Sequence, residues 1–117
     1  DGTAKVPPGL LEQVFELNEQ LDEIRESRES GGDAATLGER LDSARKPIDL
    51  KREEHEREVE SLSAKWDQQL AAGDAAAKRA TLEALRERLL ERNYINNLLA
   101  SIDREVQSLE PRAESHG

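Results

Sequence analysis

The side chains best able to do chemistry in this sequence are His55 and the carboxylates around it. His55 lies within the run Glu53-Glu54-His55-Glu56-Arg57, and the second histidine, His116, lies close to the C-terminus. A helical metal site on such a run needs partner ligands from a facing helix, and His116 falls in a predicted tail. We therefore expect His55 to be a partly buried seam residue and the nearby carboxylates to be solvated surface. No metal site, catalytic site or enzymatic activity is predicted.

Composition excludes further classes of function. The chain has 117 residues, no Cys, 3% aromatic residues and a formal net charge of −9. A chain without Cys cannot build a disulfide framework, a zinc ribbon, an iron–sulfur ligand set or a cysteine nucleophile, and we expect no cofactor. An acidic surface repels nucleic acid and anionic membranes. Neither is expected as a partner, and a basic protein surface suits the chain better.

No targeting or membrane-spanning pattern is visible in the sequence. A membrane-spanning helix needs about eighteen or more consecutive apolar residues, and the chain has no such run and no signal-peptide pattern. We therefore expect a cytoplasmic protein. Because the chain begins with Asp1 and not with Met, we also expect it to be a fragment or processed product.

The elements that position these residues are predicted to be helices. Ala, Glu, Lys, Leu and Arg together make up 65 of the 117 residues, a share typical of coiled coils and long helices. Apolar residues recur at helical spacing in three segments. The three seams are Leu10, Val14, Leu17, Leu21 and Ile24; then Leu37, Leu41, Ala44, Ile48, His55, Val59, Leu62, Trp66 and Leu70; and then Leu82, Leu85, Leu89, Ile95, Leu99, Ile102, Val106 and Leu109.

Glycine and aspartate mark the ends of these helices. Gly31 and Gly32 stop the first helix, and Asp33 is placed to cap the second. Gly73 and Asp74 supply a stop and a new cap within two residues, which predicts an antiparallel hairpin.

The predicted fold class is all-α: an elongated antiparallel three-helix bundle with two long helices and one shorter one. The bundle covers residues 8–110, with helices at about 8–29, 34–72 and 75–109. Residues 1–7 are predicted to be a linker or disordered tail, and residues 111–117 a disordered tail. Pro47 lies inside the second helix, and we expect it to kink that helix near Ser43 and Ala44.

Some apolar residues are not needed by the core stripe. At about 100° per residue, Leu11 and Phe15 stand well away from the first seam. Tyr94 stands similarly off the third seam, and counting from the two turns places it at the level of Leu11. The acidic residues of the first helix gather on the side away from its seam: Glu12, Glu16, Glu19 and Glu23. An apolar and acidic patch of this kind is typical of a helix that docks onto another protein.

Two alternatives remain open for this patch. Leu11 and Phe15 can belong to a wide core face that contacts both other helices. The chain can also be a structural coiled-coil oligomerisation or adaptor module, in which Leu11, Phe15, Tyr94 and Leu98 meet their symmetry mates. Self-association through this patch is compatible with binding of another protein.

The first and third helices also carry two longer motifs. One is Leu11-Glu-Gln-Val-Phe-Glu-Leu-Asn-Glu-Gln-Leu-Asp-Glu-Ile24, and the other is Leu85-Arg-Glu-Arg-Leu-Leu-Glu-Arg-Asn-Tyr-Ile-Asn-Asn-Leu98. With the central stretch Lys46-Pro-Ile-Asp-Leu-Lys-Arg-Glu-Glu-His-Glu, they resemble the C-terminal domain of HscB-type J-protein co-chaperones of iron–sulfur cluster assembly. The resemblance covers about residues 8–107.

The resemblance implies a domain that binds the iron–sulfur cluster scaffold protein. In that family an N-terminal J-domain, which this chain lacks, stimulates a specialised Hsp70, so the implied function is that of a co-chaperone fragment delivering the scaffold protein to that Hsp70. The residues that match the family's scaffold contacts are Leu11, Phe15, Glu16, Glu19, Glu23 and Tyr94. Glu12 departs from the family's frequent second apolar residue, and Phe15 replaces a more usual Leu.

Overall fold

The computed structural model describes residues 6–109, and within this range the chain is helical without a strand. A short 3-10 helix, η1 (Pro8–Leu10), leads into α1 (Leu11–Glu29), which is followed by α2 (Ala34–Ala72) and α3 (Ala75–Leu109). The prediction of an all-α fold with three helices is confirmed.

The helix ends follow from local chemistry. The carboxylate of Asp33 accepts a hydrogen bond from the Thr36 amide at 3.0 Å and so caps α2. At the other end of α2, Gly73 has φ 71°, the left-handed conformation that glycine adopts without strain. The carboxylate of Asp74 then accepts from the amide of Ala77 at 3.0 Å, in the first turn of α3. Both turns therefore use the residues that the sequence marks for them.

Pro47 lies inside α2, on its exposed side. Its missing amide removes one bond of the helical ladder and does not end the helix, because α2 remains α-helical from Ala34 to Ala72.

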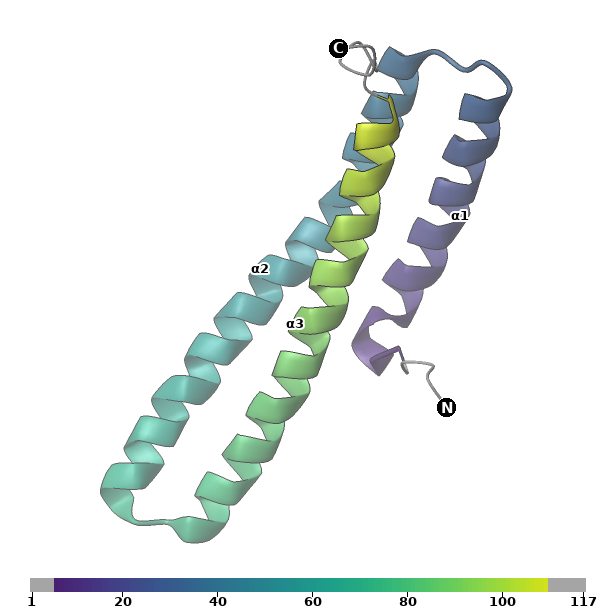
Figure 1. Ribbon diagram of the computed structural model, residues 1–117. Helices are drawn as coiled ribbons and strands as arrows, with labels where there is room; N and C mark the ends of the chain where they lie inside the picture. The colour runs from purple at the N-terminus through teal and green to yellow at the C-terminus, as the bar shows by residue number, and fades with distance from the viewer. Residues whose placement is uncertain (1–5, 110–117) are drawn as a thin grey trace, which may run out of the picture.

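The helices form an elongated body of 62 × 30 × 27 Å (Figure 1). Helices α2 and α3 run alongside each other in opposite directions as a long hairpin, and α1 lies against one end of it. The core lies at that end, where three helices meet, and is made of Leu10, Leu17, Leu21, Ile24, Leu37, Leu41, Ala44, Ile48, Ile95, Leu98, Leu99 and Ile102. Leu98, which the oligomer hypothesis placed on the surface, is therefore a core residue.

Beyond α1 the hairpin continues as a two-helix arm, defined here as residues 56–90. No apolar side chain of the arm is fully buried. Leu70, Leu82 and Leu89 are 49%, 37% and 50% exposed, although their spacing predicts core positions. The spacing was misleading because an apolar seam is buried only where a third layer covers it.

Two predicted segments fall mostly outside the described residues. Residues 1–5 of the expected linker and the whole expected tail at 111–117 lie outside them. Val6, at the end of the expected linker, is partly buried against the core. In the part of the chain that is described, no helix combines the length and the apolar character needed to cross a membrane.

Candidate protein-docking site

The inward stripe of α1 is complete without Leu11 and Phe15. Leu10 at the end of η1, together with Leu17, Leu21 and Ile24, is almost fully buried. In contrast, Leu11 is 57% exposed and Phe15 is 63% exposed, one helical turn apart. The alternative of a wide core face that buries both side chains is therefore wrong. Two large apolar side chains of α1 stand in water.

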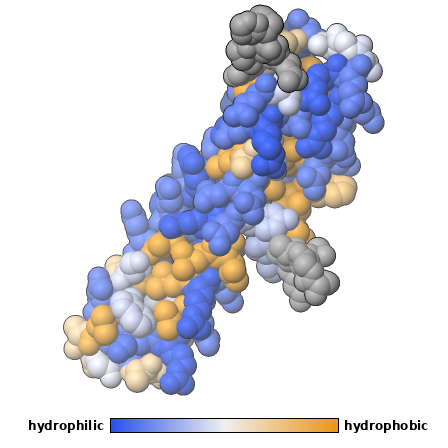
Figure 2. All heavy atoms as spheres, in the orientation of Figure 1, coloured by the Kyte–Doolittle hydropathy of each residue, from blue (hydrophilic) through white to orange (hydrophobic). Residues whose placement is uncertain are grey.

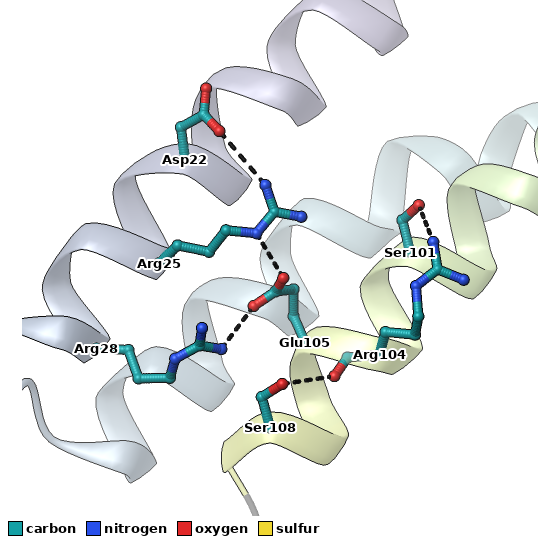
Figure 3. Close-up of polar contacts among 7 residues, drawn as sticks. All are labelled: Asp22, Arg25, Arg28, Ser101, Arg104, Glu105 and Ser108. Atoms are coloured by element: carbon teal, nitrogen blue, oxygen red, sulfur yellow. Dashed lines mark hydrogen bonds and ion pairs between the residues drawn. The ribbon is translucent and has the colours of Figure 1, made fainter.

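Leu11 and Phe15 lie on the flank of α1 that is turned toward α3. Asp22 follows Phe15 by seven residues and Leu11 by eleven, so at about 100° per residue it marks the same side of the helix. Asp22 accepts a hydrogen bond from Arg25, whose Nε donates to Glu105 of α3 at 2.6 Å (Figure 3). Leu11 and Phe15 therefore lie on the outer surface of α1, on the side from which Arg25 reaches α3.

Tyr94 reaches the same region from α3. It precedes Glu105 by eleven residues, about three helical turns, and so shares the side of α3 that faces α1. Its neighbour Ile95 lines a small cleft with Gly9 and Leu10, which puts Tyr94 at the level where α1 begins. Tyr94 is partly buried and packs against the core, so only part of its ring is open to a partner.

The three predicted carboxylates do not all join this apolar group. Glu23 Oε1 accepts a hydrogen bond from Arg40 of α2 at 2.8 Å, so it stands on the opposite flank of α1. Glu16 shares that flank because it precedes Glu23 by seven residues. Glu19 lies one turn from both Phe15 and Glu23, on the outward ridge. All three are exposed, so the site is an apolar strip on the outer surface of α1 with an acidic ridge beside it.

A polar latch that the spacing of apolar residues does not reveal holds α1 in place. Glu105 is buried and accepts from Arg25 Nε at 2.6 Å and from Arg28 Nη1 at 2.9 Å (Figure 3). The sequence does indicate that Glu105 faces α1, because Glu105 follows Leu98 by seven residues and so lies on the same side of α3. A search for apolar residues alone misses it.

A second polar cluster lies where α1 begins. His55 is 3% exposed, and neither ring nitrogen has a hydrogen-bond partner among the described residues. Glu91 Oε1 lies 3.6 Å from His55 Nδ1, and Glu91 Oε2 lies 3.4 Å from Arg88. A hydrogen bond to Glu58 raises the pKa of Arg88 above its ordinary value. The cluster separates the apolar core from the arm.

Metal coordination has no visible support in residues 6–109, where no three His, Asp or Glu side chains converge as ligands. His55 lies at the α2–α3 seam, where it is more deeply buried than the partly buried position expected from the sequence. Comparison of the chain with protein-family models, with curated proteins and with solved structures found no match.

Proposed function

We propose that this chain is a protein-docking domain of a co-chaperone that binds the iron–sulfur cluster scaffold protein. In this proposal the chain is an elongated antiparallel three-helix bundle that works in the cytoplasm, without metal, cofactor or catalytic activity. A J-domain outside this chain would stimulate the specialised Hsp70 that receives the scaffold protein. The motifs at residues 11–24 and 85–98 suggest this family.

The observation that carries the proposal is the exposure of Leu11 and Phe15 on a helix whose core stripe is already filled. Neighbouring exposed apolar side chains that form one patch are typical of a protein-binding surface, and Leu11 and Phe15 stand one helical turn apart on α1. Apolar anchors near the centre of an interface usually contribute most of its binding energy. Phe15 and Leu11 are the proposed anchors, and the exposed edge of Tyr94 extends the same strip.

The carboxylates have a different role in this proposal. Glu16 and Glu19 are exposed, and Glu23 forms an exposed pair with Arg40. Charges at the rim of an interface mainly accelerate encounter with a partner of opposite sign. The acidic ridge therefore favours a scaffold protein with a basic docking face and orients it over the apolar strip.

Titration calorimetry with the scaffold protein tests the proposal directly. Phe15→Ala and Leu11→Ala should each weaken binding by about 1–3 kcal/mol, the usual cost of truncating an interface anchor. Leu50→Ala is the matched control, because Leu50 is 59% exposed on α2 and lies outside the site. Circular dichroism should show unchanged helicity in all three variants. The proposal fails if the unmodified chain does not bind the scaffold protein, or if Phe15→Ala and Leu50→Ala bind equally well.

A further inference from the structure

The arm carries an apolar surface that is separate from the docking site. Hydrophobic side chains reach the surface of the arm in Figure 2. Four leucines of the arm are exposed: Leu70 at the end of α2, and Leu82, Leu89 and Leu90 on α3. Leu90 precedes Tyr94 by four residues and so lies on the other side of α3. The surface described here is made of Leu70, Leu82 and Leu89, which are one-third to one-half exposed. A two-helix layer can cover one edge of each apolar stripe, and burial of the rest needs another layer.

These leucines lie on the face of the hairpin opposite α1. Two small clefts identify the two faces of the hairpin. The cleft on the α1 side is lined by Gly9 and Leu10 together with Glu54 and Glu91. The other cleft is lined by Glu56 and Asn96 and by no residue of η1 or α1, so these two residues mark the opposite face. Leu70 follows Glu56 by fourteen residues, and Leu82 and Leu89 precede Asn96 by fourteen and seven. Since seven residues are about two helical turns, all three leucines continue the face marked by Glu56 and Asn96. The docking strip on α1 is not part of it.

The charged residues beside these leucines differ in sign between the two helices, with acidic residues on α2 and basic residues on α3. Glu60 and Asp67 on α2 are seven residues apart, and Asp67 precedes Leu70 by three, the spacing of neighbours on one side of a helix. On α3, Arg79 and Arg86 precede Leu82 and Leu89 by three. All four charged residues are exposed, and none forms an ion pair among the described residues. The face thus has an acidic edge on α2 and a basic edge on α3.

The two edges also match in height. Arg88 of α3 donates to Glu58 of α2 at 2.8 Å, which sets the register of the two helices. Two residues further toward the tip on each helix, Glu60 is level with Arg86. Seven residues beyond that pair, Asp67 is level with Arg79. Two residues of each sign therefore stand at the same two levels on opposite edges of one apolar face.

We propose that this arm face, made of Leu70, Leu82 and Leu89 with Glu60, Asp67, Arg79 and Arg86, binds a second copy of this chain. A two-fold axis parallel to the arm brings α2 of one copy against α3 of the other at equal height. Glu60 then meets the partner's Arg86, and Asp67 meets the partner's Arg79. The leucines of both copies fill the centre of a four-helix bundle.

The charge of the arm favours a second copy over a basic or acidic partner. The chain carries a net charge of −9, whereas the arm has six Lys and Arg against seven Asp and Glu, a net charge of −1. Within the arm, residues 56–72 carry −2 and residues 75–90 carry +2. A surface that holds both signs in equal measure on opposite edges is complementary to itself. An axis that placed α2 against α2 would oppose like charges.

Sedimentation equilibrium of the 117-residue chain tests this dimer by charge reversal. One variant is Arg79→Glu with Arg86→Glu, and the other is Glu60→Arg with Asp67→Arg. Each variant alone should weaken self-association at least tenfold, because like charges oppose each other at both edges. An equimolar mixture should restore association to within about threefold of the unmodified chain, because the two altered faces complement each other.

The control variant is Lys65→Glu with Arg104→Glu. Both residues are exposed and lie outside the arm face. The two substitutions change the net charge by the same amount as Arg79→Glu with Arg86→Glu. It should self-associate like the unmodified chain.

Three results overturn the proposal: an unmodified chain that stays monomeric up to several hundred micromolar, single variants that associate normally, or a mixture that fails to restore association. Restoration on mixing also shows that the variants are folded. A monomeric chain would assign the arm face to a different protein.

Discussion

The ion pairs of Glu105 with Arg25 and Arg28, which form the latch between α1 and α3, allow a quantitative test of what holds α1 in place. Changing Glu105 to Gln keeps the shape of the side chain and removes its charge. Glu105 accepts two hydrogen bonds, from Arg25 at 2.6 Å and from Arg28 at 2.9 Å. Gln can accept only through its one carbonyl oxygen, and its amide group would face a guanidinium. At least one of the two hydrogen bonds is therefore lost.

The expected cost follows from the exposure of the partners. The Glu105 side chain is 10% exposed, but those of Arg25 and Arg28 are 42% and 31% exposed. Removing one partner of a fully buried ion pair costs about 3–5 kcal/mol, because the remaining charge is stranded. Here both arginines can turn to water, so the loss is closer to that of a hydrogen bond to a charged group. We expect Glu105→Gln to lower the free energy of unfolding by about 2 kcal/mol.

Urea denaturation followed by circular dichroism measures this change. Asp103→Asn is the control, because Asp103 pairs with Arg45 at the surface, where an ion pair contributes at most about 1 kcal/mol. Hydrogen exchange should also show that α1 amides open more often in Glu105→Gln than in the control, because the latch joins α1 to the hairpin. If the two variants lose the same stability, or if α1 exchange is unchanged, the latch does not hold α1.

Further outcomes follow from other features of the chain. His55→Leu should raise the free energy of unfolding by about 1 kcal/mol, because a buried polar ring without a partner is replaced by an apolar side chain; a destabilised variant in urea denaturation would show that the ring nitrogens matter to the fold. Gly73→Ala should lower the free energy of unfolding by about 1 kcal/mol, because Gly73 has a left-handed φ that alanine adopts only with strain. Gly38→Ala should raise it by about 0.5–1 kcal/mol, because Gly38 lies inside α2 with open space around it. Equal effects of the two substitutions in urea denaturation would contradict this explanation. Glu19→Lys should slow association with the scaffold protein and flatten its salt dependence relative to Glu29→Lys, as measured by stopped flow; an association rate that does not depend on salt in the unmodified chain would exclude steering.

Helix type and helix ends were readable from the sequence because their causes are local. The cap at Asp33 and the left-handed glycine at Gly73 depend on a few neighbouring residues. The seam from Leu10 to Ile24 also indicated that Leu11 and Phe15 are not needed in the core, but only their exposure in the structure excludes a wide core face.

The sequence could not show which apolar positions of the hairpin are covered by another element. Leu89 and Leu99 both belong to the apolar seam of the third helix, yet Leu99 is buried in the three-helix core and Leu89, on the face opposite α1, is half exposed on the arm. Periodicity predicts which side of a helix is apolar and does not predict whether another element covers it. The buried Glu105 was missed for a related reason, since its burial depends on two arginines that are distant in sequence.

The polar cluster around His55 divides the hairpin into a half that supports α1 and a half that does not. Because α1 and its latch contact only the first half, the length of the arm is not constrained by the docking strip. Seven residues inserted into or deleted from each limb near Gly73 would move the tip by two helical turns and preserve every side-chain direction. Evolution can therefore lengthen or shorten this end of the molecule in whole heptads while the surface that carries α1 keeps its structure.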